Sequence, residues 1–260
     1  MIKKYQEVCS IIRQEEIGTD IYAMWLSTEN IAKAAVPGQF VSVYCNEGSR
    51  ILPRPISICE VKDDKTALKI VYRVVGKGTD EFCKLKSGDK LRVLGPIGNG
   101  YTLRKEKALL VAGGIGVPPM VELAKQLKAS GVEDIAAVVG YRDELFLKEK
   151  LEQYCKVYVA TEDGSYGTKG NVLDAIKQEG LECKVIYSCG PMPMLKALAA
   201  YAEDNDIEAQ ISLEERMACG IGACLGCITK TKKKDSHSNV NNARICVDGP
   251  VFDSREVDFS

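Results

Sequence analysis

The pattern of apolar and polar residues divides the chain into a first part of short strands and a second part in which strands alternate with helices. Within residues 1–100, alternating or β-branched runs are separated by turns rich in glycine, proline and aspartate, which is typical of a small antiparallel barrel or sandwich. The predicted strands cover residues 7–12, 21–26, 39–44, 56–61, 67–74 and 90–94. The glycine-rich segment 95–100 then indicates the exit from this part.

After residue 100, continuous apolar runs predict strands at 108–112, 135–139, 156–161 and 184–188. Amphipathic stretches between and after them predict helices near 120–129, 144–154, 172–178 and 194–203. Strands that alternate with helices predict a parallel sheet with helices on both faces. We therefore expect a multidomain α+β protein with an antiparallel β-barrel at 1–100, a doubly wound parallel α/β domain at 101–207 and a small C-terminal module at 208–260.

The composition is that of an ordinary globular protein, with 45% hydrophobic and 27% charged residues. A net charge of −1 argues against nucleic acid as a general partner. No apolar run reaches the roughly 18 residues of a membrane span, and the first residues lack the apolar core of a signal peptide. With eleven cysteines, this predicts a reducing, cytoplasmic location. Six cysteines are expected to be buried free thiols: Cys9, Cys45, Cys59, Cys83, Cys155 and Cys183.

The single histidine excludes several kinds of catalysis. A zinc enzyme with histidine ligands needs two or three of them, and a Ser-His-Asp triad needs one that is well placed. His237 falls in a polar, lysine-rich segment, so we expect a solvated side chain without a catalytic role. The neighbouring lysines are expected to be a solvated loop rather than a nucleic-acid patch.

Four cysteines near the C-terminus carry the most specific chemistry. Cys219, Cys224 and Cys227 follow a C-x4-C-x2-C spacing and Cys246 comes later, which is the spacing of a plant-type [2Fe–2S] site. Glycines between them allow backbone N–H groups to approach the cluster sulfurs. A structural zinc site is the main alternative, although zinc usually takes paired C-x2-C spacings and only Cys224 and Cys227 provide one. Disulfides are a third interpretation.

Two turns rich in glycine and proline follow predicted strands of the α/β part, as G-G-I-G-V-P-P at 113–119 and C-G-P-M at 189–192. Ligands of open α/β sheets bind at the carboxyl ends of strands, where a helix N-terminus favours a pyrophosphate. A third loop at 162–167 completes this rim. Each turn alone is compatible with a plain structural turn, but together, beside a redox cluster, they predict a nicotinamide site. The candidates are Gly113, Gly114, Gly116, Pro118, Cys189, Gly190, Pro191 and Met192.

The sequence R-P-I-S at 54–57 begins a predicted strand in the β-rich part. We expect Arg54 and Ser57 to share one face of this strand, where a guanidinium and a hydroxyl can bind phosphate oxygens. Without further information, the two residues are equally compatible with an ordinary surface arginine and serine.

These motifs and their order resemble a known family. R-P-I-S in a β-domain, G-G-I-G-V-P-P, C-G-P-M, M-A-C-G-I-G-A-C and a late C-V-D-G-P-V-F make nearly the whole chain similar to the electron-transfer subunits of dihydroorotate dehydrogenase B, in the ferredoxin–NADP reductase superfamily. The resemblance implies FAD in the barrel, NAD(H) in the α/β domain and a [2Fe–2S] cluster in the C-terminal module. The cluster segment is its most specific part.

The resemblance also implies roles for individual residues. It implies that Arg54 and Ser57 hold the flavin pyrophosphate and that Cys189 lies near the nicotinamide and helps to align it; a buried strand-end thiol is the alternative for Cys189. Many superfamily members carry an aromatic residue inside the Arg-x-x-Ser motif, so the stacking partner of the flavin stays open here, with Tyr72 a candidate. The implied flavin contacts are Arg54, Pro55, Ile56, Ser57, Val71, Tyr72, Arg73, Gly78 and Thr79.

The activity that the resemblance implies is electron transfer between NAD(H), FAD, the cluster and an FMN-containing dihydroorotate dehydrogenase catalytic subunit. The two subunits would form a heterotetramer that serves pyrimidine (UMP) biosynthesis. One alternative is the flavin/iron–sulfur subunit of another NAD(P)H-dependent complex, of the ferredoxin:NADP or sulfide type. Another is a non-enzymatic interaction module with a zinc-stapled tail. The choice between NADH and NADPH stays open, because Arg142 and Asp143 follow the second α/β strand and point opposite ways.

Overall fold

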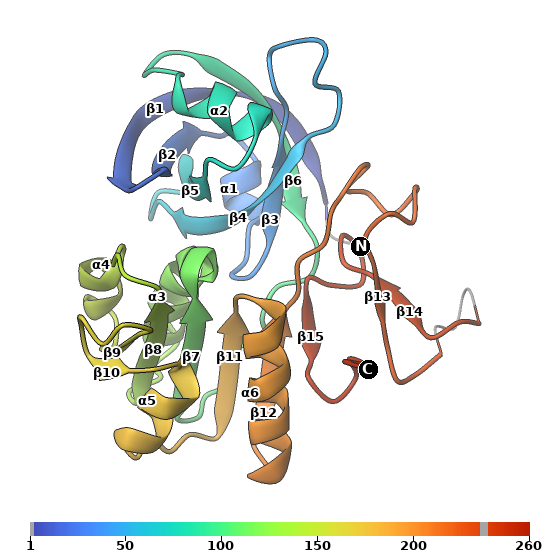
Figure 1. The fold of residues 1–260 in the computed structure, drawn as a ribbon. Coiled ribbons are helices and arrows are strands. Elements are labelled where there is room, and N and C mark those ends of the chain that lie inside the picture. The colour runs from blue at the N-terminus through green and yellow to red at the C-terminus, as the bar shows by residue number, and fades with distance from the viewer. Residues whose placement is uncertain (1–2, 235–238) are drawn as a thin grey trace.

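The first part of the chain forms a closed six-stranded antiparallel barrel. The computed structural model describes residues 3–234 and 239–260, and Figure 1 shows the barrel above a layered α/β domain. The strands have the order β1-β2-β5-β4-β3-β6, and two short helices are added to them. The bounds are β1 (Tyr5–Gly18), β2 (Ile21–Ser27), α1 (Ile31–Ala34), β3 (Phe40–Val43), β4 (Arg54–Val61), β5 (Ala67–Arg73), α2 (Lys77–Cys83) and β6 (Lys90–Ile97).

Alternation of side chains along the strands produces this barrel. In β1, Cys9 and Ile11 are buried in the barrel core, whereas Val8 and Ile12 point outward and are exposed. All six strands predicted for this part are confirmed, and the helices α1 and α2 are additions that the pattern did not predict. The predicted antiparallel barrel is therefore confirmed.

The second part is a seven-stranded sheet with the order β10-β9-β8-β7-β11-β12-β15. Every pair is parallel except β12 with β15, which is antiparallel at the edge. Its elements are β7 (Ala108–Gly113), η1 (Gly114–Gly116), α3 (Pro118–Ala129), β8 (Ile135–Tyr141), α4 (Lys148–Glu152), β9 (Lys156–Thr161), β10 (Thr168–Lys169), α5 (Val172–Gln178), β11 (Val185–Cys189), α6 (Met192–Asp204), β12 (Glu208–Ser212) and β15 (Val251–Asp253).

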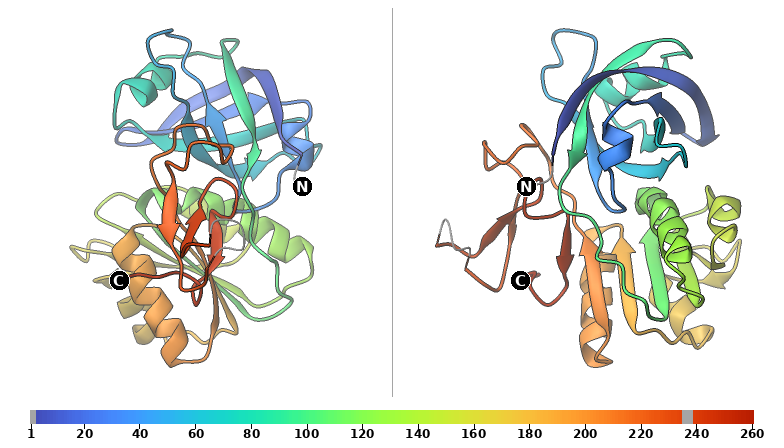
Figure 2. Two further views of the ribbon diagram at one scale, coloured as in Figure 1. Left: turned by 90° about the vertical axis from the view of Figure 1, so that its right-hand side faces the viewer. Right: turned by 180° about the vertical axis from the view of Figure 1, so that it is seen from behind.

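Helices cover both faces of this sheet, which confirms the predicted doubly wound domain. α3 and α4 pack on one face, where Leu110 and Val139 point, and α5 and α6 pack on the other, where Leu109 and Val138 point. Figure 2 shows the sheet and its helices from the side and from behind, relative to the view of Figure 1. Helix α4 is shorter than expected, because it starts only at Lys148, after a residue in the left-handed conformation.

The last segment lies beside both larger parts. A two-stranded sheet, β13 (Ile228–Lys230) with β14 (Asn242–Arg244), projects from it. In Figure 2 this orange-to-red segment runs along the barrel and the α/β domain. Strands β12 and β15 lie within residues 208–260 and yet hydrogen bond into the large sheet. The expected division of the chain at residues 100 and 207 stays a prediction.

Two expectations from composition concern the state of the cysteines and the presence of a membrane-spanning helix. All eleven cysteines are free thiols. Of the six outside the motifs, Cys9 and Cys59 are buried as expected, whereas the other four are only half-buried. None of the helices in the described part of the chain is long and apolar enough to cross a membrane. His237 lies outside the described residues.

Candidate cofactor sites

A cleft of about 740 Å³ lies between the barrel and the α/β domain, at the carboxyl ends of the parallel strands. The barrel contributes Arg73, at the end of β5, to its lining. The α/β domain contributes Gly113, Gly114 and Pro191 from the two predicted turns. One cleft therefore brings together residues expected for the flavin and residues expected for the nicotinamide.

The two turns at the cleft press against each other backbone to backbone. A side-chain carbon added at Gly116 would lie 2.2 Å from the carbonyl oxygen of Cys189, and one added at Gly190 would lie 3.0 Å from the backbone nitrogen of Gly113. Glycine is therefore required at both positions. Pro118 is the first residue of α3, where the missing N–H costs nothing, so the helix N-terminus stays directed at the cleft.

The thiol of Cys189 is held in its protonated form. Burial raises the pKa of Cys189 to about 12, the charge of Glu214 acts in the same direction, and a hydrogen bond with Ser212 opposes them. The thiol is therefore not a nucleophile at neutral pH. Cys189 is not among the residues that line the cleft, and Met192, at the start of α6, is 41% exposed. Both residues belong to the second turn but do not line the cleft itself.

The prediction that Arg54 and Ser57 share one face of β4 is wrong. Arg54 lies opposite Val43 and Ser57 lies opposite Phe40 in the β3–β4 pair. Because the two residues are three positions apart, the alternation of a strand places them on opposite faces of β4. The expectation failed because only residues an even number apart share a face.

The guanidinium of Arg54 is nevertheless held beside a second predicted flavin residue. A side-chain carbon at Gly78 would lie 2.0 Å from Nε of Arg54, so the arginine packs directly on the first turn of α2. Arg54 also donates a hydrogen bond to the carbonyl of Leu52. Thr79 holds the same turn, because its Oγ1 accepts from the N–H of Val75 at 3.0 Å. The motifs at 54–57 and 78–79 therefore meet.

The candidate stacking residue Tyr72 is buried in the barrel. Its side chain is 3% exposed, with the rings of Tyr22 and Phe82 both 6.0 Å away, centroid to centroid. Its hydroxyl donates to Oε1 of Gln14 at 3.0 Å. Tyr72 therefore has no free ring face for a flavin, whereas the next residue, Arg73, reaches the cleft. Val71 also lies in β5 and is buried.

The four motif cysteines form two pairs, Cys219 with Cys224 inside the three-cysteine loop and Cys227 with Cys246 of a later segment. The N–H groups of Ile221 and Cys224 point at Sγ of Cys219, at 3.5 and 3.4 Å. Burial opposes the thiolate, but these hydrogen bonds lower the pKa of Cys219 to about 6. Cys246 hydrogen bonds with Cys227, and burial together with this contact raises the pKa of Cys246 to about 12.

The four motif thiols thus form two pairs, one within the three-cysteine loop and one between that loop and the later segment. A [2Fe–2S] cluster takes two thiolates on each of its two irons, so this donor set fits such a cluster. The guanidinium of Arg244 donates to the carbonyl of Gly222 at 3.4 Å and also pairs with Asp248 at 3.1 Å. Arg244 thus ties the three-cysteine loop to the segment that carries Cys246.

Sequence reasoning missed a clamp between the barrel and the α/β domain. Oε2 of Glu122, in α3, accepts from the N–H of Val61 at 2.8 Å, and Nζ of Lys125 donates to the carbonyl of Val61 at 2.7 Å. Val61 is the last residue of β4, whose first residues are the predicted flavin motif. Glu122 is 2% exposed, although it lies in an otherwise apolar stretch of the helix. This glutamate within an apolar stretch was the one feature of the sequence that could have indicated the clamp.

An ion-pair network supports the same interface. Glu60, in β4, pairs with Lys69 of the barrel at 2.8 Å and with Lys150 of α4 at 2.7 Å. Burial alone raises the pKa of the Glu60 carboxyl, but hydrogen bonds from Lys150 and Lys69 outweigh burial and hold the pKa below its usual value.

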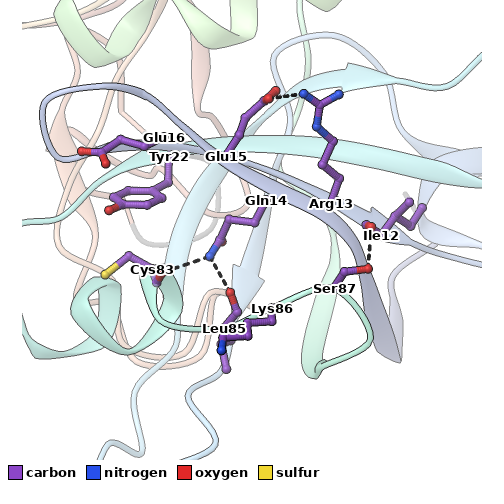
Figure 3. Close-up of a pocket in the computed structure, with 10 residues that line it drawn as sticks. All are labelled: Ile12, Arg13, Gln14, Glu15, Glu16, Tyr22, Cys83, Leu85, Lys86 and Ser87. Carbon is purple, nitrogen blue, oxygen red and sulfur yellow. Dashed lines mark hydrogen bonds and ion pairs between the residues drawn. The ribbon is translucent and has the colours of Figure 1, made fainter.

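A second hollow, of about 360 Å³, lies on the barrel away from these motifs (Figure 3). None of the residues implied to contact the flavin or the nicotinamide lines it, and its Gln14 and Ser87 side chains are already paired within the barrel. Gln14 donates to the carbonyls of Cys83 and Leu85 at 3.2 and 2.9 Å, and Ser87 donates to the carbonyl of Ile12 at 2.9 Å. This hollow is therefore not a candidate cofactor site.

Family models match the chain in three consecutive segments. Residues 8–101 match an oxidoreductase FAD-binding domain, and residues 110–200 match an oxidoreductase NAD-binding domain. Residues 214–258 match the iron–sulfur cluster binding domain of dihydroorotate dehydrogenase B. The fold and these matches define an oxidoreductase that combines FAD, NAD(H) and an iron–sulfur cluster for electron transfer.

Curated relatives narrow this class to one family. A protein of Fusobacterium nucleatum subsp. nucleatum is 43% identical over 97% of this chain and 98% of its own length, and one of Bacillus mycoides is 42% identical over 95% and 96%. Both are named dihydroorotate dehydrogenase B (NAD(+)), electron transfer subunit. The chain belongs to the family of electron-transfer subunits of dihydroorotate dehydrogenase B.

Solved structures share the fold. The structure of an NADH-dependent reduced ferredoxin-NADP oxidoreductase is 30% identical, with a TM-score of 0.87, and the match covers 97% of this chain and 90% of that chain. Phthalate dioxygenase reductase, at 18% identity and a TM-score of 0.62 over 93% of this chain and 94% of that chain, shows the same fold. The curated relatives are thus more similar in sequence than the ferredoxin-NADP oxidoreductase.

Proposed function

We propose that this chain carries electrons between NAD(H), FAD and a [2Fe–2S] cluster and a separate FMN-containing catalytic subunit that oxidises dihydroorotate in pyrimidine (UMP) biosynthesis. FAD, when bound, accepts or donates hydride and exchanges single electrons with the cluster. The chain itself binds, orients and shields these groups. The names of its relatives support the dihydroorotate partner, and the family models support the three cofactors.

One observation carries this proposal: the barrel sheet contacts both other cofactor regions. Arg73, from the barrel, lines the same cleft as the nicotinamide turns. On another side, Phe40 and Ile97 of the barrel pack in one apolar cluster with Cys227 and Cys246. A flavin bound by the barrel residues would then lie between a hydride donor and a one-electron acceptor, which is the order that the function requires.

We assign the predicted residues of the barrel to the flavin and those of the two turns to the nicotinamide dinucleotide. Arg54, beside Gly78, would hold the flavin pyrophosphate, and Ser57 would contact the flavin from the opposite face of β4. Gly113, Gly114 and Gly116 would hold the dinucleotide pyrophosphate at the start of α3. The protonated thiol of Cys189 would pack behind the nicotinamide as an aligning group.

The charges of the cleft favour NADH over NADPH. Arg142 is accompanied by three carboxylates, Asp143, Glu144 and Glu162, at the ends of β8 and β9. A ribose hydroxyl can donate to a carboxylate, whereas the 2′-phosphate of NADPH would be repelled by this acidic surplus.

The cluster cysteines and the partner complete the proposal. Cys219, Cys224, Cys227 and Cys246 would ligate the two irons, with Cys224 exposed toward the protein that receives or supplies the electrons. We propose a heterotetramer of two copies of each subunit. The seven cysteines outside the cluster site are free thiols, which suits a reducing, cytoplasmic compartment.

The test is to purify the chain anaerobically with its natural partner and to measure dihydroorotate-dependent reduction of NAD+. The complex is expected to be active, and the chain alone, with FAD and cluster, is expected to oxidise NADH with an artificial acceptor but not to oxidise dihydroorotate. A complex that carries Cys224→Ser is the control for the cluster route. Dihydroorotate oxidation by the isolated chain would contradict the proposal. An intact complex that oxidises only NADH would indicate that the electron acceptor belongs to a ferredoxin:NADP or sulfide system instead.

A further inference from the structure

Ser42, in β3, has a buried hydroxyl without a hydrogen-bond partner among the described residues. The residue is 1% exposed. Within residues 3–234 and 239–260, the only other buried side-chain oxygen or nitrogen in this state is Oγ of Ser188. Leaving a buried hydroxyl unpaired costs free energy, so native proteins seldom retain one unless something else completes it.

The direction of Ser42 follows from the alternation of β3. Val41 and Val43 lie in the core inside the barrel, whereas Phe40 lies in the apolar cluster that contains Cys227 and Cys246. Ser42 is two positions from Phe40 and so faces the same way. Its hydroxyl therefore points out of the barrel, toward the segment that carries the motif cysteines.

Two neighbours define the place of this hydroxyl. A side-chain carbon added at Gly220, the residue after Cys219, would lie 3.0 Å from Oγ of Ser42. In the β3–β4 ladder, Ser42 is paired with Pro55, inside the predicted flavin motif. The unpaired hydroxyl thus lies between the strand expected to hold the flavin and the loop expected to hold the cluster.

We propose that Ser42 is a positioning residue for electron transfer between flavin and cluster: its Oγ–H donates a hydrogen bond to a sulfur atom of the loaded cluster site. The inference rests on the cluster assignment of the proposed function. It assigns the donor to the barrel, whereas the N–H groups that reach Sγ of Cys219 and Cys224 all come from the cysteine loop itself.

The expected consequence is a cluster that is easier to reduce. Reduction adds negative charge, and a hydrogen bond donated to a cluster sulfur stabilises the more negative form. Removal of the hydroxyl should therefore shift the cluster midpoint potential to a more negative value. In the chain without its cluster, the same removal deletes only an unpaired polar group, so it should not weaken the fold.

The experiment compares wild type with Ser42→Ala as the full chain loaded with FAD and cluster. Redox titration followed by EPR and visible spectra gives separate midpoint potentials for the cluster and the flavin. The expected result is a loss of about tenfold in the reduction equilibrium constant of the cluster, about 59 mV for one electron, with the flavin unchanged. Thermal unfolding before cluster reconstitution should show no loss of stability.

The controls separate a hydrogen bond from a packing effect. Ser188→Ala removes the other unpaired buried hydroxyl and should leave the cluster potential unchanged. Ser42→Thr and Ser42→Val have nearly the same shape, and only the threonine keeps the hydroxyl, so only the valine should show the negative shift. Equal potentials in these two variants, or a shift of the flavin alone, would overturn the inference about Ser42. A wild-type chain that binds no iron would overturn the proposed function as well, and iron analysis distinguishes the two failures.

Discussion

The clamp on Val61 allows a prediction about how the two nucleotide-binding parts are held together. In Glu122→Ala, the N–H of Val61 loses its acceptor, and Val61 is only 1% exposed, so water cannot easily replace it. A buried donor left unpaired costs about 1–3 kcal/mol. Gln126, which donates to Oε1 of Glu122 at 2.7 Å, loses its partner too, but this side chain is half-buried and can turn to solvent. We therefore expect a loss of about 2–3 kcal/mol at this interface.

Glu122→Ala should affect flavin reduction by NADH more than it affects thermal stability. Helix α3 begins at the turns proposed for the nicotinamide, and β4 begins with the proposed flavin motif, so the clamp joins the elements expected to carry the two sites. Hydride transfer needs the reacting atoms within about 3–3.5 Å of each other. We expect Glu122→Ala to lower the rate of flavin reduction by NADH at saturation more than it changes the affinity for NADH.

The assay combines stopped-flow flavin reduction with hydrogen exchange at the Val61 amide. Glu122→Gln keeps an oxygen acceptor for that N–H and is the matched control, so it should retain most of the protection and most of the rate. The reasoning is refuted if the alanine and glutamine variants exchange equally slowly at Val61, or if Glu122→Ala alters only the affinity for NADH.

Three further predictions concern the sites and the interface. Gly116→Ala places a carbon 2.2 Å from the carbonyl oxygen of Cys189, so NADH binding measured by calorimetry should weaken at least tenfold while the FAD content stays at one per chain. Gly78→Ala places a carbon 2.0 Å from Nε of Arg54, so the purified protein should lose FAD, as its visible spectrum would show, and retention of full FAD would contradict the assigned contact. The lowered pKa of Glu60 means that its ion pairs stabilise the protein above the usual carboxyl pKa of about 4.3 and stop doing so as the pH falls through the lowered value; melting curves from about pH 7 to about pH 3 should therefore fall less steeply for Glu60→Gln.

Periodicity predicted the strands well because alternation and apolar runs report directly which side chains face a core. It could not predict α2, because Lys77–Cys83 is short, begins after a glycine and buries only Gly78, Thr79 and Phe82. Such a helix depends on the barrel that it packs against rather than on its own sequence. The same holds for β15, a three-residue strand that forms only because β12 offers a free edge.

The same distinction between local signals and long-range contacts applies to the candidate sites. The cysteine spacing and the glycine turns are local, and a local signal can be seen in the sequence. The partners of Val61 and of Ser42 are long-range: Glu122 is 61 positions from Val61, and Gly220 lies on another part of the fold from β3. No sequence pattern states which buried N–H a carboxylate will accept from, or which hydroxyl will remain unpaired. These contacts required the folded chain.

The barrel strands β3 and β4 explain why the three cofactor regions belong to one chain. β4 starts with the proposed flavin motif at Arg54 and ends at Val61, which α3 holds through both its N–H and its carbonyl. Its neighbour β3 presents Phe40 and Ser42 to the cysteine segment. A cofactor relay depends on protein groups that fix orientation and distance, since the bond chemistry belongs to the cofactors. Two adjacent strands, hydrogen bonded to each other, can fix both distances at once, so a change that loosens β4 should affect the nicotinamide and cluster sides together.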